Sequence, residues 1–219
     1  GEEIWNYKTE KSFIKSQQKL SIAINKNGKD IFFINSLGDL TSLDLISGNL
    51  NWQTPTQSTD IYESSFLLKN SDIIFVDGLI YFSNNKNEFF AVDSKTGVLK
   101  WKQFINSNLR PVFADDIIFT VSLEGYLALI DHRNGNILRM TYIFDKFKKS
   151  KIKNIVPTGF VVSRENIYVS LNNGKLIKVD ILFGKPRDIL KLSSGKLSKP
   201  YISNNFMYVV RDNAILKIK

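Results

Sequence analysis

Residues 93–101, DSKTGVLKW, decide the fold because their pattern returns along the chain. An Asp is followed four residues later by Gly, and that Gly is followed four residues later by Trp. Complete or degraded copies are DLISGNLNW (44–52), DHRNGNILR (131–139), DILFGKPRD (180–188) and GEEIW (1–5). The five glycines are spaced by 47, 49, 38 and 49 residues. Recurrence in phase indicates a structural repeat rather than a single catalytic motif.

Short runs with alternating apolar and polar residues lead into these copies, at 38–45, 87–94, 124–131 and 173–180, and a fifth run ends the chain at 213–219. Another β-rich run precedes each, next to Asn, Asp or Gly. Such runs predict strands joined in hairpins, and no segment has a helical period. Each unit then holds about four strands, the content of one propeller blade.

We therefore predict an all-β fold, a β-propeller of four-stranded antiparallel blades with about five blades in this chain. The whole chain, 1–219, is expected to be a single propeller domain. Its blade units are predicted near 9–55, 56–105, 106–143, 144–192, and 193–219 with 1–8. Residues 1–8 could close a five-bladed ring by adding the outer strand to the last unit, or the chain could be part of a larger ring.

The residues of the motif have a structural explanation. Gly allows the tight turn, Asp can accept hydrogen bonds from turn amides, and an indole can lie flat between neighbouring blades. We predict this inter-blade role, and no catalytic role, for Trp5, Trp52, Trp101, Gly48, Gly97, Gly135, Gly184, Asp44, Asp93, Asp131 and Asp180.

Composition excludes several kinds of site. The 219 residues include no Cys and one His, so disulfides, zinc–thiolate sites and cysteine nucleophiles are absent and a His-rich metal site is excluded. His132, in the turn DHRNG, is expected to be an exposed turn residue rather than a ligand. No apolar run approaches the roughly 20 residues of a membrane span, and no signal peptide is visible. We expect no cofactor and no metal.

Two loops are candidate partner contacts. The net charge of +9 permits an anionic partner, although Lys, Asn and Ile are abundant throughout. The lysine run, which comprises Lys146, Lys148, Lys149, Lys151 and Lys153, is predicted on a rim loop, either simply solvated or facing an acidic protein or an anionic membrane surface. The second loop mixes acidic, apolar and aromatic groups, as protein contacts do: Asp60, Ile61, Tyr62 and Glu63. Nucleic acid is disfavoured because no aromatic stacking platform accompanies the lysines.

The run GYLALID (125–131), with Gly and Trp at later repeat positions, resembles the repeat of quinoprotein-like (PQQ-like) propellers. Residues 110–138 and 204–219 resemble late blades of the BamB family of outer-membrane protein assembly factors. That resemblance implies the C-terminal portion of an eight-bladed, non-enzymatic periplasmic lipoprotein. It also implies binding to a periplasmic domain of the barrel-assembly subunit, as a monomeric propeller associated with the outer membrane through a lipid anchor outside this chain.

Two other classes stay open. A PQQ-like oxidoreductase would, by the same family resemblance, need a vicinal Cys pair, a calcium site and a catalytic Asp. This chain has no Cys, and its repeated aspartates have the structural explanation given above. A different periplasmic propeller, acting as a sensor or binding module, would share the repeat. The WD-repeat class is disfavoured because its Gly-His and Trp-Asp dipeptides are absent.

Overall fold

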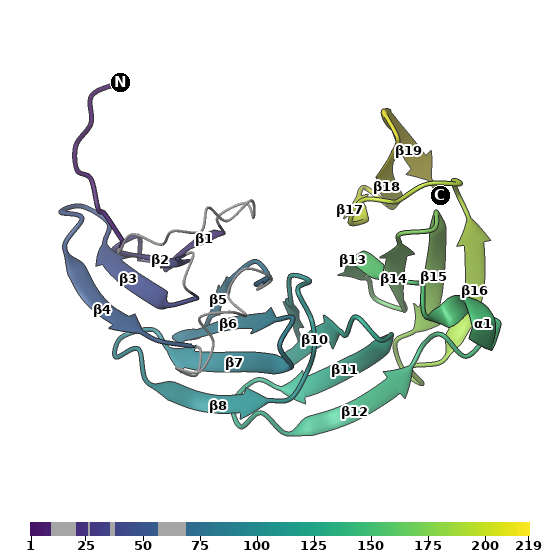
Figure 1. Cartoon of the computed structure of the whole chain (residues 1–219), viewed down its shortest axis with the longest axis horizontal. Coiled ribbons are helices and arrows are strands. Elements are labelled where there is room, and N and C mark those ends of the chain that lie inside the picture. Colours follow the sequence, from purple (N-terminus) through teal and green to yellow (C-terminus); the bar gives the residue numbers. More distant parts are fainter. Residues whose placement is uncertain (10–20, 26, 36–37, 57–68) are drawn as a thin grey trace. The chain divides into compact units, whose positions relative to one another are not determined.

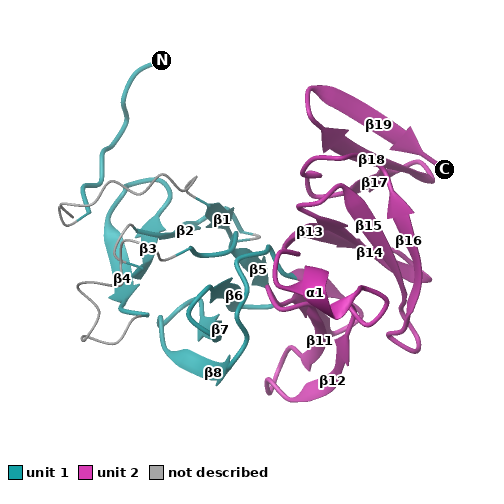
Figure 2. Ribbon diagram, turned by 45° about the vertical axis from the view of Figure 1, so that its right-hand side comes forward, with its two compact units in different colours: residues 1–111 teal, residues 112–219 magenta. Residues whose placement is uncertain are grey.

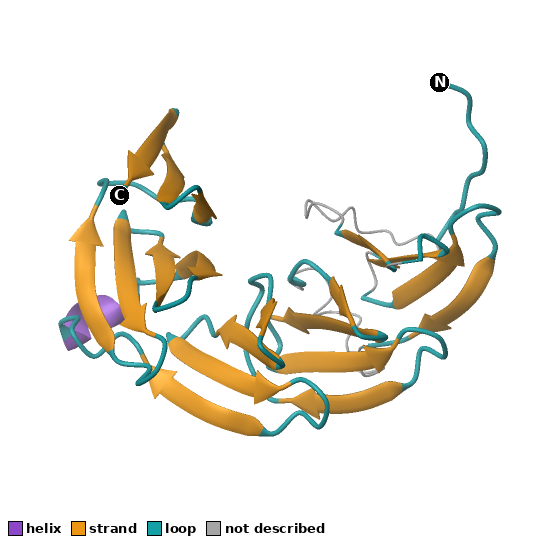
Figure 3. Ribbon diagram, turned by 180° about the vertical axis from the view of Figure 1, so that it is seen from behind, coloured by secondary structure: helices purple, strands orange, loops and turns teal. Residues whose placement is uncertain are grey.

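A computed structural model describes residues 1–9, 21–25, 27–35, 38–56 and 69–219. In these ranges nearly all regular structure is β, and the one helix is a single turn, as Figure 3 shows. The all-β prediction is therefore confirmed. The chain divides into two compact units, Gly1–Pro111 and Val112–Lys219 (Figure 2).

Unit 1 holds two four-stranded sheets (Figure 1). Sheet 1 runs β1-β2-β3-β4, with bounds Ile22–Ile24, Asp30–Ile34, Leu40–Asp44 and Leu50–Thr54. Sheet 2 runs β5-β6-β7-β8, with bounds Ile74–Val76, Leu79–Asn84, Glu88–Asp93 and Leu99–Gln103. In both, the spatial order equals the chain order, because each strand is joined to the next as an antiparallel neighbour.

Unit 2 holds three sheets built in the same way. Sheet 3 contains β9 to β12, at Val112–Ala114, Ile117–Val121, Tyr126–Asp131 and Ile137–Tyr142. Sheet 4 contains β13 to β16, at Pro157–Val162, Asn166–Leu171, Lys175–Asp180 and Pro186–Lys191. Sheet 5 has three strands, β17 to β19, at Tyr201–Ser203, Phe206–Arg211 and Ala214–Ile218.

The hairpin turns use the residues that the sequence offered as turn signals. Asp115 and Asp116 have φ of 51° and 61°, and Asn204 and Asn205 have φ of 50° and 63°. Two consecutive left-handed residues match the right-handed twist of the flanking strands, and Asn and Asp tolerate that conformation better than other side chains. The local chemistry therefore fixes which strands pair.

The third and fourth strands of sheets 1 to 4 share a β-bulge. The register shifts between Ser42 and Leu43, between Ala91 and Val92, between Leu129 and Ile130, and between Lys178 and Val179. Each shift comes one or two residues before the motif Asp. A bulge bends the strand and increases its twist, so it turns the chain toward the corner that follows.

Side chains from neighbouring sheets share their cores. In unit 1, Phe32 and Leu40 of sheet 1 cluster with Ile80, Phe82 and Phe90 of sheet 2. In unit 2, Leu176 of sheet 4 clusters with Met207 and Val209 of sheet 5. Because one four-stranded sheet cannot cover its own two faces, this shared burial explains why the unit is repeated.

Two features differ from the sequence expectation or extend it. Part of the lysine run forms the one-turn helix α1, Lys149–Ile152, where a loop was predicted; its side chains are all at least partly exposed, which is why no apolar periodicity marked it. Residues 1–9 form no strand. Closure of sheet 5 by residues 1–8, and the single domain over 1–219, stay predictions.

Candidate functional site

The repeated motif forms the same corner four times, between the third and fourth strands of sheets 1 to 4. In sheet 2 the Gly97 N–H donates to the Asp93 carbonyl at 2.8 Å, and the Asp93 N–H donates to the Val98 carbonyl at 2.9 Å. The corners at Asp44, Asp131 and Asp180 repeat both bonds within 0.1 Å. Each corner thus closes on itself through its backbone.

The Asp side chain completes the corner. In sheet 1, Asp44 Oδ1 accepts hydrogen bonds from the N–H groups of Ile46 and Ser47 at 3.0 and 2.7 Å, and from the Ser47 hydroxyl at 2.8 Å. Asp93 accepts the equivalent three bonds from Lys95 and Thr96. Carboxylate oxygens used in this way hold the turn amides, as expected of Asp at the start of a turn.

These bonds lower the pKa of all four carboxyl groups. The Ser47 N–H and hydroxyl lower the pKa of Asp44. Burial alone would raise the pKa of Asp93, but hydrogen bonds from Thr96 and Lys95 outweigh it. The N–H of Arg133 lowers the pKa of Asp131, and the N–H of Phe183, with the Arg187 guanidinium, lowers that of Asp180. Hydrogen bonds to the ionised form favour that form.

We expect acid to weaken the fold through these corners. Since the pKa of each Asp is lower in the folded than in the unfolded chain, the stabilisation is complete above an unfolded pKa of about 3.9. It is lost as the pH falls through the lower folded values. Thermal unfolding followed by circular dichroism should give a steady midpoint between about pH 7 and pH 5 and a falling one below about pH 4. A double variant, Asp44→Asn with Asp93→Asn, should have a shallower acid dependence; an equally steep one would contradict this role.

Indoles lie against two of the corners. Trp52 Nε1–H donates to the Ser94 carbonyl at 3.0 Å, and its ring lies where a Cβ on Gly97 would be, 2.6 Å from Cε3. Trp5 donates to the Leu45 carbonyl at 3.1 Å and covers Gly48 in the same way. Each acceptor is the residue after the motif Asp. Each indole is therefore held on its corner by one hydrogen bond, and the glycine leaves the space that the ring needs.

Arg139 takes the place of the indole in sheet 3, a substitution that the sequence indicated only as a lost Trp. Its Nη2 donates to the Ile181 carbonyl at 2.6 Å, the acceptor equivalent to Leu45 and Ser94, and its Nη1 donates to Leu182 O. The guanidinium lies over Gly184, with Nε 2.9 Å from an ideal Cβ there. A planar side chain with N–H donors meets the same geometric requirement as an indole.

Trp101 is buried among aromatic side chains of its own sheet. It stacks on Phe89 with ring centroids 5.8 Å apart and an interplanar angle of 9°, and it lies 5.7 Å from Tyr81. Stacked rings at this separation add to the area that they bury. These contacts place Trp101 against its own sheet, and its inter-blade role stays a prediction. Gly135 closes the Asp131 corner of sheet 3 through its own N–H.

The prediction that His132 is exposed is wrong. Its exposed fraction is 4%, and its ring meets Phe113 edge-on with centroids 5.2 Å apart. His132 follows the motif Asp directly, as Ser94 does, and Ser94 is buried too. The corner directs the side chain at this position into the protein. The polar sequence DHRNG gave no indication of that burial.

The lysine run surrounds a small apolar anchor. Phe144, Phe147 and Ile155 are buried, whereas all five lysines are exposed. Lys146 Nζ donates to the Arg187 carbonyl on β16, which ties the run to sheet 4. The second predicted contact, Asp60 to Glu63, lies outside the described residues.

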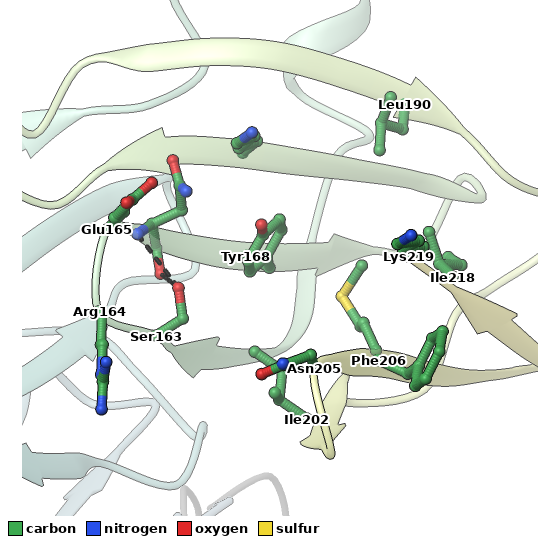
Figure 4. Close-up of a pocket in the computed structure, with 13 residues that line it drawn as sticks. Ser163, Arg164, Glu165, Tyr168, Leu190, Ile202, Asn205, Phe206, Ile218 and Lys219 are labelled. Carbon is green, nitrogen blue, oxygen red and sulfur yellow. Dashed lines mark hydrogen bonds between the residues drawn. The ribbon is translucent and has the colours of Figure 1, made fainter.

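A cavity of about 670 Å³ lies in unit 2 beside sheets 4 and 5 (Figure 4). Its lining joins Tyr168, Ile202 and Phe206 with the charged Arg164 and Glu165. Ser163 and Asn166 exchange two hydrogen bonds at its edge. Sequence reasoning did not identify this cavity, because it depends on the packing of two sheets.

Comparison with known proteins identifies the family. The family model described as outer membrane protein assembly factor BamB matches residues 1–141. The chain belongs to the BamB family. The BamB of Moranella endobia (strain PCIT) is 32% identical over 104 residues, which cover 46% of this chain and 24% of that protein.

Solved structures establish the fold. The crystal structure of BamB from Moraxella catarrhalis matches with a TM-score of 0.76 and 16% identity, over 98% of this chain and 62% of that one. The β-propeller domain of Myceliophteria thermophila Cps50 (Swd1) matches at 0.65 with 10% identity, over 90% of this chain and 62% of that one. The five sheets are therefore propeller blades, as predicted. The chain spans less than two thirds of either BamB relative.

The described residues contain no group of three or more His, Asp or Glu side chains placed to hold a metal ion. No helix in the same ranges is long and apolar enough to cross a membrane.

Proposed function

We propose that this chain is part of a non-enzymatic, protein-binding propeller that supports the assembly of outer-membrane proteins. The observation that carries the proposal is the BamB family match over residues 1–141. A BamB-type scaffold binds a periplasmic domain of the barrel-assembly subunit, and we assign that class of partner to this chain. The proposed location is the periplasm at the outer membrane, with a lipid anchor outside this chain, as a monomeric propeller that binds no nucleic acid.

The use made of the motif residues supports a scaffold. The four motif aspartates accept backbone hydrogen bonds in the corners, which gives them a structural use and favours their ionised form. Trp52 and Arg139 each donate a side-chain N–H to a corner carbonyl. We propose the same inter-blade role for the whole set predicted from the sequence, Trp5, Trp101 and the motif glycines included.

The proposed contact surface comprises loops carried on the rigid blades. Lys148, Lys149 and Lys153 are exposed on the run around α1. We propose Asp60, Ile61, Tyr62 and Glu63, which lie outside the described residues, as the second contact. Loops on a rigid scaffold are where binding residues gather, and rim charges mainly affect association and its salt dependence. An acidic face on the partner would complement the run.

A capture experiment tests this function. The chain is immobilised and offered each periplasmic domain of the barrel-assembly subunit in turn; we expect one domain to be retained. Reversing three charges, Lys148→Glu, Lys149→Glu and Lys153→Glu, should weaken capture by about tenfold at low salt and less at high salt. Three reversals elsewhere in unit 2 are the charge-matched control: Lys196→Glu and Lys199→Glu, between β16 and β17, and Lys217→Glu on β19.

Two results would contradict the proposal. One is that no periplasmic domain is retained. The other is quinone-dependent reduction of a dye after the chain is supplied with pyrroloquinoline quinone and calcium, which would indicate the oxidoreductase alternative. A sensor or other binding module would ignore the barrel-assembly domains.

A further inference from the structure

Three lysines from different parts of unit 2 meet at a second cavity, of about 420 Å³. Lys151 comes from α1, Lys175 from β15 and Lys191 from β16. Ser150, Asn154 and Asn173 add polar groups to the lining, and we call this set of six residues the lysine pocket. The sequence pointed only to Lys151, as one of a run; sheet 4 supplies the other two.

The positive charge of the lysine pocket is uncompensated. Lys175 and Lys191 are direct register partners on adjacent antiparallel strands, an arrangement in which like charges destabilise the pair. None of the three lysines forms an ion pair within the part of the chain that the structure describes. No acidic residue is among the described residues that line the cavity. A bound anion would turn this repulsion into attraction.

Two of the ammonium groups are held in place by neighbours. Lys175 Nζ lies 5.0 Å from the centroid of the Phe147 ring, in a cation–π contact. Lys191 Nζ donates to the Asn173 carbonyl at 2.8 Å, which leaves two of its three N–H donors for another acceptor. Phe147 and Ile155, which are both buried, form the apolar part of the cavity lining. Placement before binding reduces the entropy lost when a ligand binds.

We propose that the lysine pocket binds a phosphate group, presented either by a lipid headgroup or by a free phosphate. A phosphate group carries at least as much negative charge as a carboxylate and has more acceptor oxygens, which suits three ammonium donors. Lys151 belongs to the lysine run, but the capture experiment alters Lys148, Lys149 and Lys153, which do not line the cavity, so phosphate binding can fail while protein capture succeeds, and the reverse.

The test compares two triple variants that remove the same charge. The pocket variant is Lys151→Gln with Lys175→Gln and Lys191→Gln. The control is Lys148→Gln with Lys149→Gln and Lys153→Gln, in the same run but outside the cavity lining. Inorganic phosphate is titrated against the whole chain at constant ionic strength, and the side-chain amide signals of Asn154 and Asn173 are followed by NMR. We expect saturable shifts that weaken at least about tenfold in the pocket variant and less than about twofold in the control.

Vesicles distinguish the source of the phosphate. The chain is sedimented with vesicles that contain phosphatidylglycerol, and vesicles of phosphatidylcholine alone are the control. If the phosphate belongs to a lipid, the parent chain should sediment with the phosphatidylglycerol vesicles and the pocket variant should mostly stay in the supernatant. If the chain binds inorganic phosphate but not the vesicles, the ligand is a free phosphate. Equal weakening in both triple variants would overturn the proposal, as would unsaturable shifts or an equal response to acetate. Circular dichroism checks that the pocket variant folds. Because this variant removes the repulsion between Lys175 and Lys191, its thermal unfolding midpoint should equal or exceed that of the parent chain.

Discussion

Replacing Trp52 by alanine should lower the free energy of unfolding by about 3 kcal/mol, near the lower end of the range for large aromatic side chains. The indole stacks on Phe32 with centroids 6.1 Å apart, packs against the core shared by sheets 1 and 2, and donates to the Ser94 carbonyl. Truncation removes all three contacts and leaves a cavity over the Gly97 corner. Urea unfolding followed by circular dichroism measures the loss as a lower midpoint.

Trp52→Phe is the matched control for the hydrogen bond. Phenylalanine keeps an aromatic ring against Phe32 but has no N–H for the Ser94 carbonyl, so we expect a loss of about 1 to 2 kcal/mol. Ordinary surface substitutions change the free energy of unfolding by about 0.5 kcal/mol or less. If Trp52→Ala lowers it by no more than that, the indole does not join the two sheets.

Replacing Gly97 by alanine should be nearly as damaging, by about 2 to 4 kcal/mol, although it adds one methyl group. Gly97 has φ of +72°, which is unfavourable for a residue with a Cβ. The new methyl would stand 2.6 Å from Trp52 Cε3 and 2.7 Å from Thr54 Oγ1, so the indole has to move off the corner. The same urea experiment measures the effect.

Gly78→Ala separates the two causes. Gly78 has a similar φ of +80°, but nothing lies within 4 Å of its ideal Cβ, so this variant carries the backbone strain without the clash. We expect it to cost about 1 kcal/mol. In the Trp52→Ala background the cost of Gly97→Ala should fall toward that of Gly78→Ala, because the ring is gone, but it should stay above it because Thr54 Oγ1 still lies 2.7 Å from the new methyl. Equal effects of Gly97→Ala and Gly78→Ala in the parent chain would contradict a close approach of ring and corner.

Sequence reasoning reached the hairpins and the corners because their signals are local. Asn, Asp and Gly next to the β-rich runs indicated hairpin turns, such as the one that the structure has at Asp115–Asp116, and period-2 runs indicated strands. The spacing from Asp to Gly described a corner closed by its own backbone and side-chain hydrogen bonds. The corner geometry of each nine-residue motif can therefore be predicted from the residue types in it.

The helix α1 and the burial of His132 were missed for a related reason. A one-turn helix is too short for a period of 3.6 residues to be visible, and its residues are exposed rather than amphipathic. The burial of His132 depends on a corner that directs the residue after Asp inward, onto Phe113 of another strand. Polarity alone indicated the opposite.

By itself the sequence determined that this chain is a repeat of four-stranded units with closed Asp–Gly corners, because those interactions join residues close along the chain. Tertiary structure decided which side chain fills each junction. Arg139 and Ile181 are 42 residues apart, and only packing shows that a guanidinium does there what an indole does at Gly97. Lys151 likewise meets Lys175 and Lys191 only because α1 lies beside β15 and β16, since a folded chain brings together charges that sequence spacing keeps apart.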